Sequence, residues 1–416
     1  MEVKIEKLDN FGNGITHIDN KIVFVKRALP SEVVDIEIYK EKKDIAFAKI
    51  INIIEPSKDR KKPICPYYDR CGGCDFLHIT DEVEKEFKIN KAKYLFNRCD
   101  NYYETENLNY RNKIVLHSKN GRYGLYQEET NDLVEIDYCY IVDNKINEII
   151  KSLKKDNIWG DFDITIRNFD GDILLFLDGE INNICFYDTT KIVKTIIVNK
   201  QVIVGKGYVY FYINDYKIRL GARSFFQVNL EGLNNIYKII KKFLEKKEFS
   251  HALDLYSGVS LWSILFNKEI KEIDSIEVNE EACLNAKDNI LENNINNINI
   301  INGKVEDNID KFKDIDLVIT DPPRSGMDNK TIEYLTKINS KYIIYISCNM
   351  DTLKRDIDLL NNYEIVELDL FNMFKKTYHC ETVCILERKW LWRNNIYMRE
   401  YQYYYGLLQQ LLLNYY

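Results

Sequence analysis

Apolar runs in the second half of the chain are spaced in a way that predicts strands alternating with helices. One run, from Tyr342 to Asn349, is bounded by polar residues and has the length and β-rich composition of a buried strand in a parallel sheet. Ligands of such sheets bind beyond the carboxyl ends of the strands, so Cys348 would stand at a ligand site. A lone cysteine is more often a small buried hydrophobic residue, but three neighbouring segments favour the functional interpretation.

These segments have the features of a nucleoside-cofactor site. Residues 254–258 read Asp-Leu-Tyr-Ser-Gly between an apolar pair and a helical segment, which predicts a strand, a tight turn and a helix. About twenty residues downstream, a short strand is expected to end in Glu277, where an acid would bind ribose hydroxyls. A third strand, from Leu317, leads to Asp321, which Pro322 and Pro323 hold rigidly. The pattern predicts a doubly wound sheet with a cysteine and a carboxylate at adjacent strand ends.

The first half shows short segments in which apolar and polar residues alternate. In residues 1–56 these segments are broken by Gly12-Asn13-Gly14 and by Leu29-Pro30, which predicts a small barrel of strands. The expected strand segments are Val3 to Ile5, Lys21 to Val25, Val33 to Tyr39 and Ala46 to Ile54. Residues 108–220 contain many strand-like runs, so we expect a central β-rich domain there.

Three cysteines lie between these regions. Cys65, Cys71 and Cys74 are six and three residues apart, with two glycines that let backbone amides approach ligated sulfurs. A disulfide is not expected in an intracellular chain of this size, so the pattern indicates a metal site. The spacing by itself leaves zinc and an iron–sulfur cluster both open.

The composition sets limits on the protein class. With 416 residues and 45% hydrophobic content, the chain is long enough for two or three domains. No long apolar segment or cleavable signal is evident, so we expect a soluble, cytoplasmic protein without membrane contact. The net charge of -7 argues against wholesale electrostatic binding of nucleic acid. A local basic face is still possible, and the cluster at residues 58–62 is either such a face or a solvated linker.

The motifs of residues 225–387 together resemble one family. They are similar to the catalytic domain of the S-adenosylmethionine (SAM) dependent RNA uracil-C5 methyltransferases, which make 5-methyluridine in ribosomal and transfer RNA. The resemblance implies an α/β Rossmann-like methyltransferase domain. The matching segments, in one order, are 225–229 (Phe-Phe-Gln-Val-Asn), 254–258, 321–326 (Asp-Pro-Pro-Arg-Ser-Gly), 347–349 (Ser-Cys-Asn) and 379–383 (His-Cys-Glu-Thr-Val).

The chemistry of this family explains the residue types. Carbon 5 of uracil is too weak a nucleophile to attack a sulfonium methyl group, so a thiolate first adds to carbon 6. The resemblance gives this role to Cys348 and gives Glu381 the role of the base that later removes the proton from carbon 5. The target carbon is inaccessible in a stacked helix, so the nucleotide must be flipped out or lie in a loop. The residues implied to contact SAM are Gln227, Tyr256, Glu277 and Asp321.

The resemblance extends to the first half of the chain. Residues 1–56 resemble the TRAM domain, an oligonucleotide-binding (OB) type barrel, which implies an RNA-holding module; a purely structural barrel is the alternative. The iron–sulfur branch of the family shows this cysteine spacing and takes a distant fourth cysteine. The implied ligands of a [4Fe-4S] cluster are Cys65, Cys71, Cys74 and Cys139.

The expected organisation follows from these matches. No obligate protein partner is predicted, and residues 390–416 are an extension without an assigned role. Near the start of the central domain, Arg111 and Lys113 either contact RNA phosphates or pair with acids inside the domain. The expected regions are a TRAM barrel at 1–56, an iron–sulfur segment at 57–107, a central β-rich domain at 108–220, a methyltransferase domain at 221–389 and the extension.

The resemblance implies large-subunit (23S) ribosomal RNA as the substrate, with transfer RNA as the runner-up. Two other functions compete with this one: an amine methyltransferase, whose prolines are normally followed by an aromatic residue where Arg324 stands, and an inactive iron–sulfur RNA-binding protein. Four residues depart from the family pattern, and a side chain at Ser260 is expected to crowd the cofactor turn. Ser257 and Ser260 stand where the family has a cysteine and the second glycine of the cofactor turn, and Met350 and Lys375 stand where it has prolines.

Overall fold

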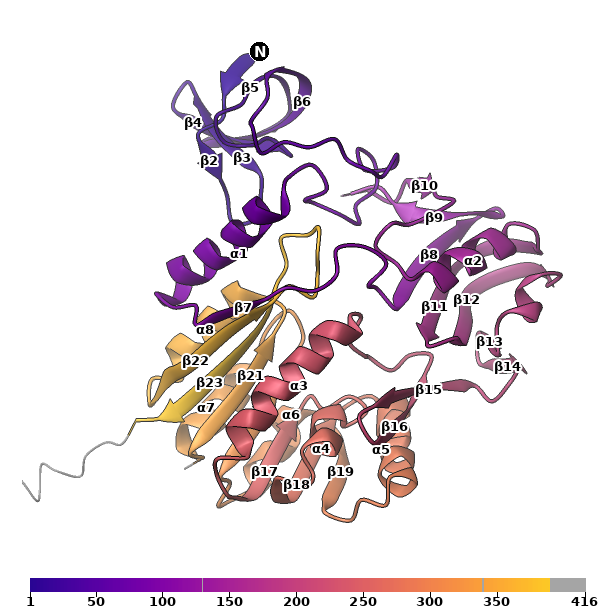
Figure 1. Ribbon diagram of the computed structural model, residues 1–416, viewed down its shortest axis with the longest axis vertical. Helices are drawn as coiled ribbons and strands as arrows, with labels where there is room; N and C mark the ends of the chain where they lie inside the picture. Colours follow the sequence, from indigo (N-terminus) through magenta and orange to yellow (C-terminus); the bar gives the residue numbers. More distant parts are fainter. Residues whose placement is uncertain (129, 339, 390–416) are drawn as a thin grey trace, which may run out of the picture.

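The structure is a computed structural model that describes residues 1–128, 130–338 and 340–389. Figure 1 shows an N-terminal sheet, a central sheet and a larger sheet flanked by helices, in chain order. The predicted extension at 390–416 lies outside the described residues. Among the described helices, none combines the length and the apolar character that a membrane crossing requires.

The N-terminal region is a six-stranded sheet around a small core. Val23, Val25, Ala46 and Ala48 are buried in that core, as the alternating pattern predicts. Two strands, β2 and β3, were not among the expected segments; β2 has only two residues, which is too short to show a period. In sheet order the strands are β1 (Glu2–Lys4), β5 (Val33–Glu41), β6 (Ile45–Glu55), β4 (Lys21–Lys26), β3 (Gly14–Ile18) and β2 (Lys7–Leu8).

The central region is a seven-stranded sheet packed against helix α2 (Asn144–Leu153). Ile146, Ile149 and Ile150 of α2 share a core with strand residues such as Ile164. A separate hairpin, β15 (Tyr208–Ile213) and β16 (Tyr216–Gly221), packs against α5 (Glu280–Glu292). The sheet order is β10 (Leu133–Glu135), β9 (Arg122–Tyr126), β8 (Lys113–Lys119), β11 (Asn157–Phe169), β12 (Asp172–Cys185), β13 (Thr195–Val198) and β14 (Gln201–Val204).

The third region is an eight-stranded sheet whose first five strands are parallel. Every residue of β21, the strand predicted from the apolar run that precedes Cys348, is buried. The sheet order is β19 (Ile298–Asn302), β18 (Ile270–Glu277), β17 (Phe249–Leu255), β20 (Leu317–Thr320), β21 (Tyr342–Ser347), β23 (Glu381–Arg388), β22 (Tyr363–Phe371) and β7 (Asn101–Tyr103). The other helices are α3 (Leu230–Leu244), α4 (Leu261–Leu265), α6 (Val305–Asn308), α7 (Asn329–Lys337) and α8 (Met350–Leu359).

Part of the segment expected to belong to the cysteine-rich unit joins this third region. Strand β7 pairs in parallel with β22 at the edge of the eight-stranded sheet. Helix α1 (Asp81–Phe96) contacts α8, and its Ala92 shares a core with Leu353. The chain after the cysteines therefore returns to the sheet that carries Cys348.

The turn after β17 adopts an unusual backbone. Tyr256, Gly258 and Ser260 all have φ between 57° and 59°. This is the left-handed region, which glycine adopts readily and in which a residue with a side chain is strained. Ser260 precedes α4, is fully buried, and its hydroxyl has no hydrogen-bond partner among the described residues. The family's glycine would adopt this conformation without strain.

We therefore expect Ser260→Gly to stabilise the protein by about 0.5–1 kcal/mol. Relief of about 1–2 kcal/mol of left-handed strain exceeds the entropic cost of a glycine, about 0.5–1 kcal/mol. The midpoint of urea unfolding measures the change. Ser257→Gly is the matched control, because Ser257 lies outside the left-handed region and should gain nothing. A Ser260→Gly variant less stable than the unsubstituted protein would contradict the strain argument.

Candidate active site and metal site

The six residues assigned by resemblance to catalysis and to SAM all line one cavity of about 690 Å³. This volume falls within the range of about 300–1,000 Å³ that is typical of small-molecule sites. The cavity lies beyond the carboxyl ends of the parallel strands, where the sequence placed it. The six residues are Gln227, Tyr256, Glu277, Asp321, Cys348 and Glu381.

Strand register brings Cys348 and Glu381 together. Ser347, the last residue of β21, pairs with Thr382 in the antiparallel strand β23. The residue after Ser347 and the residue before Thr382 are therefore opposite each other. Asp321 directly follows β20, the parallel neighbour of β21 on its other side. Three chemical groups far apart in sequence thus meet at the ends of three adjacent strands.

Burial shifts the pKa of three groups that line this cavity. Burial raises the pKa of Glu381 well above its ordinary value, Asp321 raises it further, and the Arg324 guanidinium lowers it. Burial raises the pKa of Asp321 to about 6. Burial also raises the pKa of the Cys348 thiol to about 12, an effect to which Glu381 adds and which Arg324 opposes. In the free protein at neutral pH, the Cys348 thiol is therefore mostly protonated.

Asp321 is held by two donors at the cavity wall. Gln227 Nε2 donates to Asp321 Oδ2 at 3.2 Å, and Trp262 Nε1 donates to the same oxygen at 3.4 Å. Sequence reasoning missed Trp262, which had the appearance of a core residue in a helix. It also gave no role to Phe225, which lines the cavity and is 65% exposed. An exposed aromatic ring beside a cavity is a surface on which an RNA base can stack.

The opposite part of the cavity has the features of a nucleoside site. The Gly258 N–H donates to Glu277 Oε2 at 2.8 Å, and the Asn279 N–H donates to Glu277 Oε1 at 2.7 Å. The carboxylate is thus fixed at the end of β18 with lone pairs left for ribose hydroxyls. A Cβ at Gly258 would meet nothing within 4 Å, so the turn leaves open space for a ligand. With the apolar Val278 in the lining, these residues fit SAM.

The departures from the family pattern have packing explanations. Met350 is the first residue of α8, a position that tolerates proline, and its side chain fills the core. Lys375 is buried, and its Nζ lies 2.5 Å from Glu104 Oε2. Ser257 is buried in the turn. Ser260 is not among the residues lining the cavity, so whether its side chain crowds the turn next to the cofactor stays a prediction.

The four predicted cysteine ligands line a second cavity, of about 220 Å³. Cys139 of the central region reaches the three cysteines of the N-terminal segment, and Tyr67 donates its hydroxyl to the Asp137 carboxylate at 3.3 Å nearby. Burial raises the pKa of all four thiols, and neighbouring cysteines raise further the pKa values of Cys71, Cys74 and Cys139. Positive metal ions would supply the charge that four thiolates in an apolar cavity need.

The donor set of this cavity suits a metal group held by thiolates. Four cysteine side chains around one small cavity are ligands that both zinc and a [4Fe-4S] cluster accept. The residues present therefore fit either group.

Arg111 lines both cavities. Its Nε donates to the Lys113 carbonyl at 3.0 Å. Burial, together with the charges of Arg167 and Arg111, lowers the pKa of Lys113 to about 8. Within the described residues, neither Arg111 nor Lys113 forms an ion pair with an acid. The choice between phosphate contacts and pairing with acids stays a prediction.

Comparison with known proteins gives a consistent result. Residues 188–389 match the tRNA (Uracil-5-)-methyltransferase family, and residues 1–51 match the TRAM domain. An uncharacterized RNA methyltransferase of Clostridium acetobutylicum is 32% identical over 93% of this chain and 96% of its own length. Another, from Caldanaerobacter subterraneus subsp. tengcongensis, is 30% identical over 93% of this chain and 98% of its own.

A solved structure shares the fold over nearly the whole chain. The Pyrococcus abyssi tRNA (uracil-54, C5)-methyltransferase, in complex with S-adenosyl-L-homocysteine, has a TM-score of 0.74 and 22% identity. The match covers 93% of this chain and 100% of that chain. The family match and the similar relatives agree with this shared fold. The chain therefore belongs to the tRNA (Uracil-5-)-methyltransferase family of RNA methyltransferases and carries a TRAM domain at its N-terminus.

Proposed function

We propose that this protein methylates carbon 5 of a uridine in RNA, with Cys348 as nucleophile and Glu381 as general base. The observation that carries the proposal is the register of β21 and β23, which sets a thiol opposite a buried carboxyl group in a nucleoside-sized cavity. Addition of a thiolate to a ring, followed by proton removal from that ring, requires such a pair in one cavity.

The bonds that form and break in this reaction can be assigned to residues of this chain, to the uracil ring and to SAM. The Cys348 thiol gives up its proton to solvent, and the thiolate adds to carbon 6 while the electron pair of the carbon 5–carbon 6 double bond moves toward the carbonyl oxygen at carbon 4. SAM supplies the methyl group that carbon 5 then takes, and S-adenosyl-L-homocysteine is left. Glu381 accepts the proton from carbon 5, the double bond re-forms, and the sulfur–carbon 6 bond breaks. Asp321, held by Gln227, accepts or shares a proton at the uracil edge.

The raised pKa of Glu381 supports its role as base. A carboxylate in a buried, like-charged setting binds a proton more strongly than an exposed one, so once ionised it is a better proton acceptor. The positive charge of Arg324 lowers the pKa of both Glu381 and Cys348, and so favours the ionised form of each group. We assign Arg324 the role of stabilising negative charge in the site.

We further propose a [4Fe-4S] cluster on Cys65, Cys71, Cys74 and Cys139, supported by the cavity that all four cysteines line. For the substrate we propose large-subunit ribosomal RNA, because the cysteine pattern resembles the iron–sulfur branch of the family. Transfer RNA is the second candidate, since a solved protein with this fold is named as a transfer RNA enzyme. Arg111 and Lys113, which have no acid partner in the described residues, are suited to RNA phosphates.

Two other functions fit the site less well. An amine methyltransferase needs an aromatic side chain stacked on its substrate after the prolines, and here the charged Arg324 lines the cavity. An inactive RNA-binding homologue has no need for a thiol and a carboxyl group in register, yet Cys348 and Glu381 both line the cavity.

The first experiment measures tritium release from RNA labelled at uridine carbon 5. Anaerobically purified protein with SAM should release tritium from ribosomal RNA, because methylation replaces the hydrogen at that carbon. Cys348→Ala should abolish release, and Cys283→Ala is the matched control because Cys283 lies outside the cavity. Tritium release from transfer RNA alone would show that transfer RNA, and not ribosomal RNA, is the substrate. No release from either RNA would overturn the proposed enzymatic function.

The activity should rise with pH. Because the Cys348 thiol has a pKa of about 12 and only the thiolate attacks, its reactive fraction grows about tenfold per pH unit below that value. The measurement is kcat/KM between pH 6 and 9. Arg324→Gln should move the profile to higher pH, because it removes the charge that lowers the thiol pKa. Arg122→Gln, in an exposed part of the central sheet, should leave the profile unchanged. A flat profile would contradict the argument.

Metal content tests the cluster. Anaerobically purified protein should contain iron and sulfide in equal amounts, about four of each per chain. Cys139→Ser should lower the iron content, whereas Cys185→Ser, outside the cavity, should not. About one zinc per chain, without sulfide, would show that the cavity holds a different metal.

A further inference from the structure

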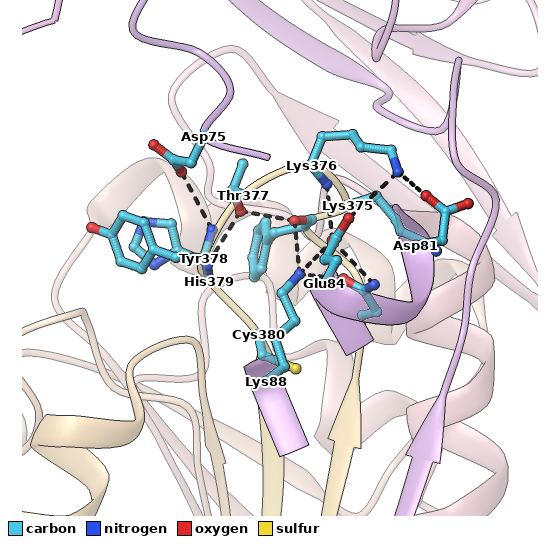
Figure 2. A network of polar contacts seen from close by, with 12 residues as sticks. Asp75, Asp81, Glu84, Lys88, Lys375, Lys376, Thr377, Tyr378, His379 and Cys380 are labelled. Carbon is cyan, nitrogen blue, oxygen red and sulfur yellow. Dashed lines mark hydrogen bonds and ion pairs between the residues drawn. The ribbon is translucent and has the colours of Figure 1, made fainter. Parts of the chain in front are cut away.

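Glu381 follows a loop, residues 372–380, that connects β22 to β23. The loop forms part of the active-site wall, because Phe374 lines the same cavity as Cys348 and Glu381. The position of Glu381 therefore depends on how this loop is held. Figure 2 shows that the loop is surrounded by polar contacts from residues far away in sequence.

One side of the loop is fixed by a buried ion pair of helix α1. Lys88 Nζ lies 2.8 Å from Glu84 Oε1, and both side chains are fully buried (Figure 2). Lys88 Nζ also donates to Asn372 Oδ1 at 2.6 Å and to the Phe374 carbonyl at 3.4 Å. Glu84 Oε1 accepts the Lys376 N–H at 3.0 Å. The pair thus binds both the start and the middle of the loop.

The backbone at Lys376 would not hold its conformation unaided. Its φ is 67°, in the left-handed region that disfavours lysine. Its side chain is buried and forms ion pairs with Asp81 and Glu84 of α1. A strained conformation persists only where its surroundings determine it, and such positions cluster at functional sites. The contacts of α1 are therefore needed to keep the loop in this shape.

The other side of the loop is fixed by the residues that follow Cys74. The N–H groups of Asp75 and Phe76 both donate to the Lys376 carbonyl, at 2.8 and 2.9 Å. The Tyr378 N–H donates to Asp75 Oδ2 at 3.3 Å (Figure 2). A direct chain of contacts thus runs from a proposed metal ligand, through Asp75, to the loop that ends at Glu381.

We propose that Glu84, Lys88 and Asp75 are positioning residues for Glu381. Through loop 372–380, the cysteine site and helix α1 together fix the base of the methylation reaction. This inference rests on the proposed function, and it gives the cysteine site a role in the final, proton-removing step, in addition to any role in binding RNA. Misplacing the base leaves addition to carbon 6 and methyl transfer possible, but it slows release of the thiolate.

The experiment follows the covalent RNA–protein adduct with SAM labelled in its methyl group. In Glu84→Gln the labelled adduct, separated on a denaturing gel, should build up, and turnover should fall on the order of tenfold or more. The KM values for RNA and SAM should stay within about twofold, because their binding groups are untouched. Glu84→Gln/Lys88→Met removes both buried charges and should give the same result without an unpaired lysine.

Glu86→Gln is the matched control. Glu86 lies on the exposed face of α1, so the same chemical change there should leave adduct level and turnover as in the unsubstituted protein. Hydrogen exchange supplies a second measurement: the amides of residues 372–380 should exchange faster in Glu84→Gln and not in Glu86→Gln.

The cysteine side is tested by Cys74→Ser and by Asp75→Ala. Both should speed hydrogen exchange in residues 372–380 and raise the adduct level, whatever their effect on RNA binding. Loss of all steps together, without adduct and without faster exchange in the loop, would overturn the inference. A failure of the proposed function is distinct, because the unsubstituted protein would then show neither adduct nor methylated RNA.

Discussion

The antiparallel pairing of β21 with β23 is the constraint on which the active site depends. A parallel strand in that place would run in the other direction, and its first residue would lie at the far edge of the sheet from Cys348. Because β23 runs antiparallel, its first residue, Glu381, lies opposite Cys348. The connection into β23 must therefore cross the active-site edge, and it does so as loop 372–380.

Burial of this edge gives the site its chemistry. The same desolvation that raises the pKa of Glu381 also raises that of Cys348, so the site binds its protons and Arg324 supplies the opposing charge. A low-dielectric cavity strengthens the base but disfavours the thiolate. Phe225, exposed beside the cavity, suggests how a bound base would complete the enclosure.

Polar contacts from several regions of the molecule meet at this loop. Helix α1 contributes the buried pair of Glu84 and Lys88, and the segment after Cys74 contributes backbone donors. Buried ion pairs add little net stability compared with apolar packing, but removing one partner is costly, so such pairs favour one geometry over others. The main effect of this network is therefore to fix the conformation of the loop. At position 375, where the family has a rigid proline, the ion pair of Lys375 with Glu104 holds the loop instead.

The sequence by itself determined the strands that lead to Asp321 and Cys348 and the turn before Glu277. The spacing of apolar residues and the local composition predict which residues of a segment are buried. Its motifs also identified the residues of the cavity. Tertiary structure decided the rest. Trp262, Lys88 and Glu84 had the appearance of ordinary helix residues, and their partners lie 59, 284 and 292 residues away in sequence. Contacts over such distances depend on how strands are ordered and how α1 packs, and no local pattern records either.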